Sequence, residues 1–413
     1  MDILIISQYL RDIRDFEKNN SRFVYLARML SNTAVVELVT SDFIHSEKKH
    51  CQNVGEFQNV KVTALHEPGY RKNVSLKRFY SHKRLSARIR KYLNARNKPD
   101  VIYCAVPSLD CAYEAARYAK KNGIRFIVDI QDLWPEAFKM FFRAPFISDA
   151  IFYPMERKAD YIYASADEII GVSDMYCERA KRVNNKVDGY HTVFLGTTAN
   201  FYQKKAEKPK RVGDMFSLVY IGTLGYSYDL KCVFRAMIEL EHRGYSNLEC
   251  LIFGDGPLED EFRRFTQVHN LDVKFYGRLP YDEMCERLMM CDIALNPIRK
   301  GSAGSVINKV GDYAMAGLPV INTQECKEYR DLLDEYGCGI NCLCESHVEM
   351  ANAIETLITD DNLRITMAKS SLTLGRSMFD RDVSYQTIVE RIMCEEKEYE
   401  NTSFDCNNES IVT

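Results

Sequence analysis

A rhythm of short apolar runs, which occurs twice along the chain, constrains the fold more than any other feature. In the first half, stretches of helical periodicity alternate with runs rich in Ile, Val and Phe: ILIIS, VVELVT, KVTAL, DVIYCA, RFIVDI, EIIGVS and TVFLG. After a polar segment, NFYQKKAEKPKRVGDM, the rhythm restarts with FSLVYIG, LECLIFG, DVKFYG, DIALNP, LPVIN and CGINCL. Strands that alternate with helices indicate βαβ units and parallel sheets. The sequence therefore predicts an α/β protein with two Rossmann-like, doubly wound domains in tandem.

The same pattern sets the predicted domain limits. They are 1–198 for the first domain, 199–214 for a linker, 215–375 for the second domain, 376–399 for a C-terminal helix and 400–413 for a disordered tail. The sequence leaves open whether the C-terminal helix returns to the first domain. Ligands of open α/β sheets bind at the carboxyl ends of the strands. Four predicted strands end in glycine there, which either lets a ligand approach the backbone or is ordinary turn chemistry: Gly196, Gly222, Gly254 and Gly277.

Composition is typical of a soluble globular protein. Of the 413 residues, 46% are apolar and 27% are charged, and no run of 18 apolar residues occurs, so we predict no membrane-spanning helix. The start, MDILIISQYLRD, is typical of a first strand rather than of a signal peptide. The 14 cysteines are scattered without CxxC spacing, which favours reduced thiols in the cytoplasm. Cys338, Cys342 and Cys344 are the nearest approach to a metal motif, but they alternate as in a strand, and we predict neither a metal nor a cofactor.

Two strand-to-helix turns in the second half have the composition of phosphate-binding loops. The first is Gly222-Thr223-Leu224-Gly225, followed by a predicted helix from about Tyr228. Such a turn presents free N–H groups and the positive end of a helix dipole to an anion. An ordinary structural turn explains this first loop equally well.

The second turn lies in SAGSVINKVGDYAMAG, where Ser305 is the expected N-cap of a helix that begins near Val306. Two such loops together suggest a diphosphate ligand. Lys309 would add positive charge for the phosphates, and Asp312, about two turns after Ser305, would accept hydrogen bonds from a ribose diol. The alternative is that both are solvated helix residues, but this does not explain their place in a helix made otherwise of Ala, Gly and Met.

The stretch DIQDLWPEAF follows a predicted strand of the first domain and is a candidate sugar site. A carboxylate beside an indole ring suits a sugar, because it offers hydrogen bonds to hydroxyls and a flat apolar face to the ring. We therefore expect Asp132, Trp134 and Glu136 to bind the acceptor, with Asp132 also a candidate base that deprotonates it. The alternative is that Trp134 anchors the core and that Asp132 is a helix N-cap.

Residues 70–98 contain eleven Lys and Arg and no acidic residue, within a first half whose net charge is +8 against −11 for the remainder from residue 201. Apolar residues recur there at mostly helical spacing, which predicts a basic amphipathic helix that contacts an anionic membrane. The expected contacts are Lys77, Arg78, Lys83, Arg84, Arg88, Arg90 and Lys91. The apolar side is aliphatic rather than aromatic, so we expect no nucleic acid partner. A solvated structural helix is the other interpretation.

Several stretches together resemble a known family. GDGPLEDEF, VKFYGRLPYDEMCERLMMCDIALNP, NKVGDYAMAGLPVINT and YGCGINC resemble the C-terminal domain of retaining glycosyltransferase family 4, which has the GT-B fold. ILIISQY, FIVDIQDLWPEAF, ADEIIGVSDMYCERA and VFLGTTANFY resemble the acceptor-side domain of members that build bacterial surface polysaccharides. The resemblance implies transfer of a sugar from a nucleotide-diphosphate donor, such as UDP-sugar, with retained anomeric configuration and without a metal. It also implies an inter-domain cleft and a lipid-linked or polysaccharide acceptor at the cytoplasmic face of the membrane.

The family's signature of two glutamates with seven residues between them falls here on Gly304 and Asp312. The ribose partner is thus present as Asp312, whereas the carboxylate that contacts the donor sugar is absent. Thr223 stands where Arg is common, and an equivalent of the family's Lys at Lys231 is uncertain. Lys309 and the N–H groups of Ser305 to Asn308 are then the expected phosphate partners, with Lys309 the catalytic cation.

Arg278 stands where the family holds the base of the nucleotide. The resemblance and the residues together predict this donor-binding set: Gly222, Thr223, Gly225, Arg278, Gly304, Ser305, Asn308, Lys309 and Asp312. Two other functions stay open at this point. One is an enzyme of the same fold that alters a nucleotide sugar without transfer, such as a 2-epimerase. The other is a degenerate partner subunit of a transferase, which the departures at Gly304 and Thr223 would allow.

Overall fold

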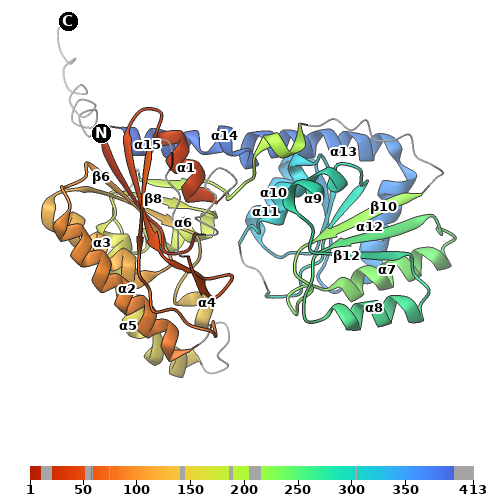
Figure 1. Cartoon of the computed structure of the whole chain (residues 1–413). Coiled ribbons are helices and arrows are strands. Elements are labelled where there is room, and N and C mark those ends of the chain that lie inside the picture. The colour runs from red at the N-terminus through yellow and green to blue at the C-terminus, as the bar shows by residue number, and fades with distance from the viewer. Residues whose placement is uncertain are drawn as a thin grey trace, which may run out of the picture. The chain divides into compact units, whose positions relative to one another are not determined.

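The protein is described by a computed structural model that covers residues 1–10, 21–51, 57, 59–73, 75–139, 145–185, 189–203, 215–302 and 305–394. The chain forms two compact units. The first comprises Met1–Gly171, Tyr176–His191 and the chain from Thr387 onward, and the second comprises Val172–Met175 and Thr192–Gln386. Each unit is an α/β structure with a sheet between helices (Figure 1).

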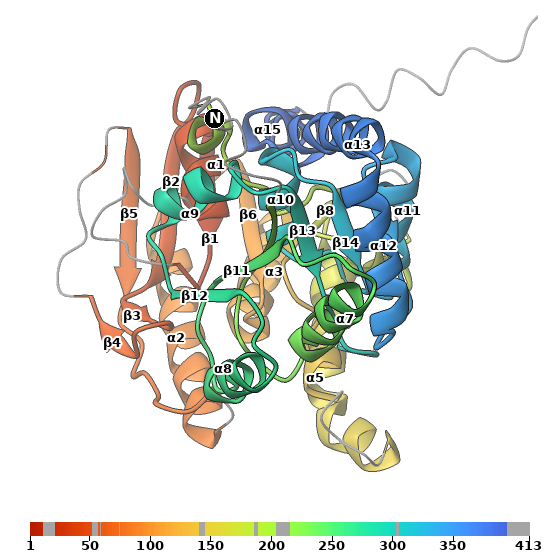
Figure 2. The ribbon, with the colours of Figure 1, turned by 90° about the vertical axis from the view of Figure 1, so that its right-hand side faces the viewer.

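The first unit contains a seven-stranded sheet in the order β5-β2-β1-β6-β7-β8-β9, and its paired ladders are parallel. Figure 2 shows β5, β2, β1 and β6 in this order across the sheet. The strands are β1 (Asp2–Ile6), β2 (Val35–Ser41), β5 (Val60–Leu65), β6 (Val101–Val106), β7 (Arg125–Ile130), β8 (Glu168–Gly171) and β9 (Tyr190–Thr192). Every residue of β6 is buried, as in a parallel strand covered on both faces. A short antiparallel pair, β3 (Phe43–Ile44) and β4 (Lys49–His50), follows β2.

Helices connect the parallel strands of this unit. They are α1 (Arg22–Leu30), α2 (Leu76–Ala95), α3 (Leu109–Asn122), α4 (Glu136–Lys139), α5 (Pro145–Ser165), α6 (Asp174–Lys181) and α15 (Gln386–Met393). α15 packs on this unit through Arg125, whose guanidinium donates to the carbonyls of Ile392 at 3.3 Å and Cys394 at 2.7 Å. The last described helix is therefore fixed to the sheet by an arginine at the start of β7.

The second unit contains a fully parallel six-stranded sheet in the order β12-β11-β10-β13-β14-β15. The strands are β10 (Phe216–Ile221), β11 (Leu248–Phe253), β12 (Val273–Gly277), β13 (Ile293–Asn296), β14 (Val320–Asn322) and β15 (Gly339–Asn341). The chain runs outward from β10 to β12 on one side and then returns to β13 on the other side. β10 and β13 therefore flank the switch point, where open α/β sheets bind ligands at the carboxyl ends of the strands.

Two apolar cores cover the two faces of this sheet, which makes the unit doubly wound as predicted. One core joins the sheet to α7 (Leu230–His242), α8 (Glu259–Val268) and α12 (His347–Thr359), and the other joins it to α9 (Tyr281–Leu288), α10 (Lys309–Met315) and α11 (Lys327–Tyr336). The remaining helical segments are η1 (Ala199–Tyr202), α13 (Asp361–Leu374), the π-helical turn η2 (Gly375–Phe379) and α14 (Arg381–Ser384). Figure 1 shows α7 and α8 on one side of the sheet and α10 on the other.

The prediction of one continuous helix over 376–399 is wrong, because the described part of this segment is broken into η2, α14 and α15. Asp380 has an extended ψ of 118° and caps α14 through a hydrogen bond from the Asp382 N–H to its side chain. The break is fixed by Arg381, whose guanidinium donates to the carbonyls of Leu195 and Gly196 at 2.9 Å each. Of the predicted linker, residues 199–203 form η1 and its end, while residues 204–214 and the predicted tail 400–413 lie outside the described residues.

Candidate functional sites

Lys309 is a buried cation at the switch point of the second unit. Lys309 is only 8% exposed, and its Nζ has no hydrogen-bond partner among the residues that the structure describes. The ammonium lies 4.0 Å from the ring centre of Tyr220 and 4.2 Å from that of Tyr228, so two aromatic faces surround it. Burial lowers the pKa of Lys309 well below its usual range. A buried charge without a counter-ion is costly, so an anion that reached this amine would be strongly favoured.

The position of Lys309 is set by the strands on either side of the switch point. Tyr313, one turn further along α10, is fully buried; its hydroxyl accepts from the Ile221 N–H and donates to the Leu295 carbonyl, both at 3.0 Å. This hydroxyl bridges the ends of β10 and β13 and so fixes α10 above them. Gly222, which follows β10 and has a φ of +131°, faces the lysine, since a Cβ there would lie 3.3 Å from Nζ. The amine is therefore positioned at the carboxyl end of β10.

The helix that carries Lys309 begins later than the sequence predicted. α10 starts at Lys309 rather than near Val306, and its N-cap is Asn308, which makes no side-chain cap bond. The predicted N-cap role of Ser305 is therefore wrong; its carbonyl instead accepts a 2.6 Å hydrogen bond from Gln324. Val306 is buried in the core beside α10, which an irregular segment permits. The N–H groups of residues 305–308 thus do not form the first turn of a helix, and Gly304 lies outside the described residues.

The glycine turn after β10 also differs from a free phosphate loop. α7 begins at Leu230, and its N-cap Asp229 accepts a 3.2 Å hydrogen bond from the Cys232 N–H, so a carboxylate already faces this helix terminus. Lys231 forms an ion pair with Glu261. Thr223 is exposed, and the predicted roles of Thr223 and Gly225 in donor binding stay predictions. Among the predicted phosphate partners, Lys309 has a buried side-chain nitrogen without a hydrogen-bond partner in the described part of the chain, and its role in phosphate binding stays a prediction.

Two of the glycines at the other strand ends, Gly196 and Gly254, serve backbone packing. A Cβ at Gly254 would lie 1.9 Å from the Gly222 carbonyl oxygen, and a Cβ at Gly196 would lie 2.4 Å from the Phe379 carbonyl oxygen. No other residue fits at these two positions without displacement of the backbone. Their glycines are therefore explained by the fold itself, in agreement with the simpler of the two interpretations.

Asp312 is held by two tyrosines. Its Oδ1 accepts hydrogen bonds from Tyr202 at 2.8 Å and from Tyr281 at 2.5 Å, and burial raises its pKa although both hydroxyls lower it. Its second oxygen accepts no hydrogen bond from a described residue. The carboxylate thus keeps an acceptor for a ribose hydroxyl, and this role stays a prediction. The same holds for Arg278, which is exposed just after β12.

Trp134 lies in an aromatic cluster of the first unit instead of on its surface. It is 6% exposed, stacks on His82 with ring centres 6.0 Å apart and planes at 14°, and meets Phe138 at 4.8 Å. The guanidinium carbon of Arg78 lies 4.7 Å from the indole. The prediction of an open stacking face for a sugar is therefore wrong, because these neighbours cover the ring. The alternative of Trp134 as a core anchor is the one that the structure supports.

The carboxylates near Trp134 have partners in the protein. Asp132 accepts a 3.1 Å hydrogen bond from the indole N–H of Trp134, and burial raises its pKa. A raised pKa brings a carboxylate closer to the range that suits a general base, so this role stays a prediction. Glu136 forms an ion pair with Arg179, which also binds Asp160 at 2.7 Å. Glu136 is thus engaged in a salt bridge, and its role in acceptor binding has no support from this geometry.

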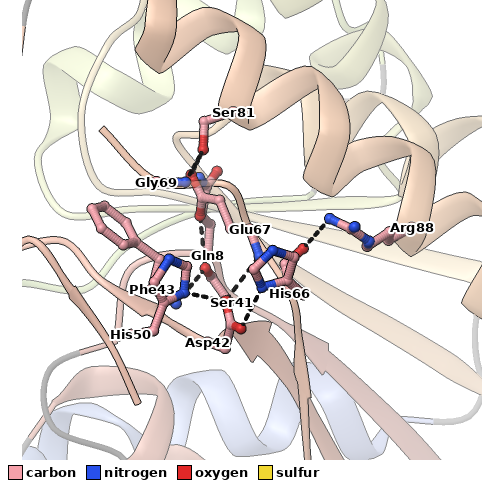
Figure 3. Close-up of polar contacts among 10 residues, drawn as sticks. All are labelled: Gln8, Ser41, Asp42, Phe43, His50, His66, Glu67, Gly69, Ser81 and Arg88. Carbon is pink, nitrogen blue, oxygen red and sulfur yellow. Dashed lines mark hydrogen bonds and ion pairs between the residues drawn. The ribbon is translucent and has the colours of Figure 1, made fainter. Parts of the chain in front are cut away.

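A polar network at the ends of three strands was missed by the sequence analysis. The carboxylate of Glu67, which is 1% exposed, accepts from Gln8 at 3.0 Å, Ser41 at 2.7 Å and Ser81 at 2.8 Å (Figure 3). Gln8 follows β1, Ser41 ends β2 and Glu67 follows β5, so the network lies at the carboxyl edge of the sheet. The signal was present in the sequence, because each of these polar residues ends or follows an apolar run at the edge where ligands bind.

The predicted membrane helix is α2, and the structure corrects the prediction in two respects. First, its apolar stripe of Leu85, Ile89 and Leu93 is at most 2% exposed and packs inside the unit. Second, Arg78 is 8% exposed and donates to the Asn73 carbonyl at 2.8 Å, so it is no membrane contact.

The other predicted contacts of α2 fall into two groups. Arg88 donates to the His66 carbonyl at 2.6 Å, and Arg90 lies 3.8 Å from Glu114. The other group is exposed and has no such partners among the described residues: Lys77, Lys83, Arg84 and Lys91. Among the described residues of α2, the exposed large apolar side chains lie at the start of the helix, where Leu76 is 88% and Tyr80 58% exposed. The first turns of α5 also expose Ile147 at 59% and Ile151 at 55%. Within the described residues, no helix has the length and apolar character needed to cross a bilayer.

Comparison with known proteins identifies the class to which this fold belongs. Residues 201–372 match the family "Glycosyl transferases group 1". The chain is similar to the "Probable glycosyltransferase WbjE" of Pseudomonas aeruginosa, with 25% identity over 261 residues, which are 58% of this chain and 61% of WbjE. The similarity thus spans less than two thirds of that relative.

Solved structures give the same class of fold. HepE from Anabaena, in complex with UDP-glucose, superposes with a TM-score of 0.63 at 15% identity, covering 95% of this chain and 99% of HepE. WaaG, a glycosyltransferase involved in lipopolysaccharide biosynthesis, superposes with a TM-score of 0.61 at 13% identity, covering 95% of this chain and 100% of WaaG. The fold is therefore GT-B, as predicted, and the family match to residues 201–372 spans less than half of the chain.

Proposed function

We propose that the protein is a retaining, metal-independent glycosyltransferase that moves a sugar from a UDP-sugar or a similar donor to a lipid-linked or polysaccharide acceptor. The observation that carries this proposal is the buried ammonium of Lys309, which has no hydrogen-bond partner among the described residues and lies at the switch point of a segment that matches glycosyl transferases group 1. A diphosphate supplies the missing counter-charge there. The UDP-glucose bound by the GT-B relative HepE supports a nucleotide sugar as the donor.

Departure of a nucleoside diphosphate builds negative charge on its phosphate oxygens while the sugar becomes an oxocarbenium-like cation. Lys309 is held in place before the reaction by Tyr220 and Tyr228, so it needs little reorganisation to meet that charge. Such a preorganised donor contributes about 3 to 4 kcal/mol to the transition state. In this mechanism the acceptor hydroxyl attacks on the face that the leaving phosphate vacates, which retains the anomeric configuration. Asp132 is the candidate base.

We also propose that the first unit attaches to the inner face of the cytoplasmic membrane, where a lipid-linked acceptor for surface polysaccharide would be. The exposed apolar side chains of Leu76 and Tyr80 at the start of α2, with Ile147 and Ile151 on α5, support this contact. Aromatic contacts link the two helices, because the ring centre of Phe138 lies 6.3 Å from that of Phe79 on α2 and 6.0 Å from that of Phe152 on α5. The exposed lysines and arginines of α2 then face anionic lipid headgroups.

The test begins with a thermal-shift panel of nucleotide sugars, since a ligand at 100 times its dissociation constant adds about 2.7 kcal/mol of stability. The stabilising donor is then incubated with a lipid extract, and the labelled sugar is followed by chromatography and NMR. Label that appears in lipid or glycan with the donor's anomeric configuration supports the proposal. A changed sugar that stays on the nucleotide indicates a 2-epimerase. Donor binding without turnover indicates a partner subunit.

A further inference from the structure

Three side chains of metal-ligating types meet at the carboxyl edge of the first unit's sheet, and none of them has a role in the proposed glycosyl transfer. His66 Nδ1 lies 2.8 Å from Asp42 Oδ2, and His50 Nδ1 lies 3.2 Å from Asp42 Oδ1 (Figure 3). One ligand atom from each residue lies within 4.8 Å of those of the other two. The side chains are 20% exposed for Asp42, 39% for His50 and 54% for His66, so the group is open to solvent.

Backbone pairing, not chance contact of mobile side chains, brings these residues together. β2 and β5 are paired in register from Val36 to Ser41, and the Asp42 N–H extends that ladder by donating to the Leu65 carbonyl at 3.0 Å. Asp42 is therefore directly opposite His66. β4 pairs with β3 in a register that places His50 opposite Phe43, the residue after Asp42. Three separate elements thus supply one ligand each.

We propose that Asp42, His50 and His66 form a binding site for a divalent transition metal ion of the zinc class. Imidazole nitrogen and carboxylate oxygen are ligands of zinc at about 2.0 to 2.2 Å, in tetrahedral geometry. Atoms at such distances from one ion lie about 3.3 to 3.5 Å apart, so the observed spacing needs only small side-chain rotations. Three protein ligands with an open fourth position leave room for water.

Groups around the three ligands hold them in orientation, as is usual in metal sites. The Glu67 N–H donates to Asp42 Oδ1 at 2.8 Å, and the Arg88 guanidinium donates to the His66 carbonyl at 2.6 Å. The ring of His50 packs on Phe43 at 5.4 Å and on His66 at 5.1 Å. These contacts leave each histidine with its Nδ1 directed at the carboxylate, so the ligand set is largely formed before an ion binds.

Bound metal would join the β3–β4 pair to the ends of β2 and β5, beside the buried Glu67 network. An ion bound there would stabilise this edge of the unit, because it would join elements that are separate in the sequence. The proposed site is independent of the proposed transferase activity, which uses no group of this cluster. The candidate would bind metal equally well if the reaction were a different one.

The test uses the full chain without an affinity tag, after removal of metal by EDTA. Zn²⁺ binding is measured by calorimetry, and Co²⁺ is titrated as a spectroscopic probe. We expect one zinc site per chain, an upward shift in thermal unfolding temperature on Zn²⁺ addition, and a Co²⁺ spectrum without thiolate-to-cobalt charge transfer. His50→Gln and His66→Gln should each weaken Zn²⁺ binding at least about tenfold, because a lost ligand costs no less than a lost supporting contact.

The matched control is His242→Gln, which removes an exposed histidine at the end of α7 in the second unit and should leave binding unchanged. Far-UV circular dichroism checks that each variant is folded. Unchanged Zn²⁺ affinity in folded His50→Gln and His66→Gln would overturn the proposal. So would a thiolate charge-transfer band, which would assign the metal to cysteines, or the absence of any Zn²⁺ binding by the unaltered chain.

Discussion

Replacing Lys309 with methionine should raise the stability of the free protein and weaken donor binding at the same time. Methionine keeps an unbranched chain of similar length and removes the charge. A buried ion carries a desolvation penalty of several kcal/mol, and Tyr220 and Tyr228 offset part of it by cation–π contacts worth about 2 kcal/mol when desolvated. We expect a net gain of about 1 to 2 kcal/mol, or an increase of about 2 to 8 °C in the unfolding temperature of the second unit.

Donor binding should change in the opposite direction. A hydrogen bond from Lys309 to a phosphate is charge-assisted and contributes about 1.5 to 3 kcal/mol. At about 1.4 kcal/mol per factor of ten, its loss weakens the affinity for UDP by about 10- to 150-fold. The assay is calorimetry with UDP beside thermal unfolding without it. Lys369→Met, which removes an exposed lysine of α13, is the control and should change neither quantity.

The pH dependence gives a second readout of the same residue. Because burial lowers the pKa of Lys309, the unfolded chain binds one more proton than the folded chain between that lowered pKa and the ordinary value near 10.5. The contribution of Lys309 to the free energy of unfolding is therefore lost as the pH falls through that window. The Lys309→Met variant should lack this dependence of stability on pH. UDP should also bind with uptake of a proton in the same window. Equal UDP affinity in the variant, or a fall in its stability, would refute the assignment of Lys309 to the donor site.

Three further predictions concern other parts of the chain. Tyr281→Phe removes a hydrogen bond to the half-buried carboxylate of Asp312 and should destabilise the second unit by about 1.5 to 3 kcal/mol in urea unfolding; an unchanged midpoint would contradict the bond. His82 is buried, and desolvation lowers its pKa to about 3, so the unaltered chain should lose about 1.4 kcal/mol of stability from this group between neutral pH and pH 5.5, as its unfolded form takes up a proton. His82→Gln should flatten that part of the stability profile, and an equal slope would contradict the prediction. The double variant Leu76→Glu/Tyr80→Glu should float with anionic liposomes at least about tenfold less than the unaltered chain, whereas equal flotation would exclude this surface as the membrane contact.

The architecture could be predicted because it depends on repeating local patterns. Runs such as ILIIS and FSLVYIG fix which segments become buried parallel strands, and the restart of the rhythm after the polar segment predicts two units. Lys309 could likewise be singled out from the sequence as a candidate functional residue, because a lysine in a helix of small and apolar residues is unusual. Polar residues that follow apolar runs, such as Gln8, could have been recognised by the same logic.

Tertiary structure alone decided what the polar residues contact. From the sequence, Trp134 could equally well bind a sugar ring or anchor the core. The structure decides between them, because the ring of His82 stacks on the indole. Arg78 lies on the basic helix with six other predicted membrane contacts, yet it turns inward toward Tyr9 and Trp134. Side chains at similar helical positions differ in this way because burial depends on neighbours that are distant in sequence.

The start of α10 shows the same division between local and tertiary control. By local preference Ser305 is a good N-cap, but Val306 enters the apolar core and Gln324 binds the Ser305 carbonyl, so the helix begins three residues later than Val306, at Lys309. The sequence by itself determined the order of the strands and helices, and it placed a lysine in the helix that follows β13. Packing across the switch point of the sheet decided that the lysine is buried between two tyrosines, with no hydrogen-bond partner in the part of the chain that the structure describes. The reason is that Tyr220 and Tyr228 come from β10 and the loop after it, whereas Lys309 lies on the helix after β13.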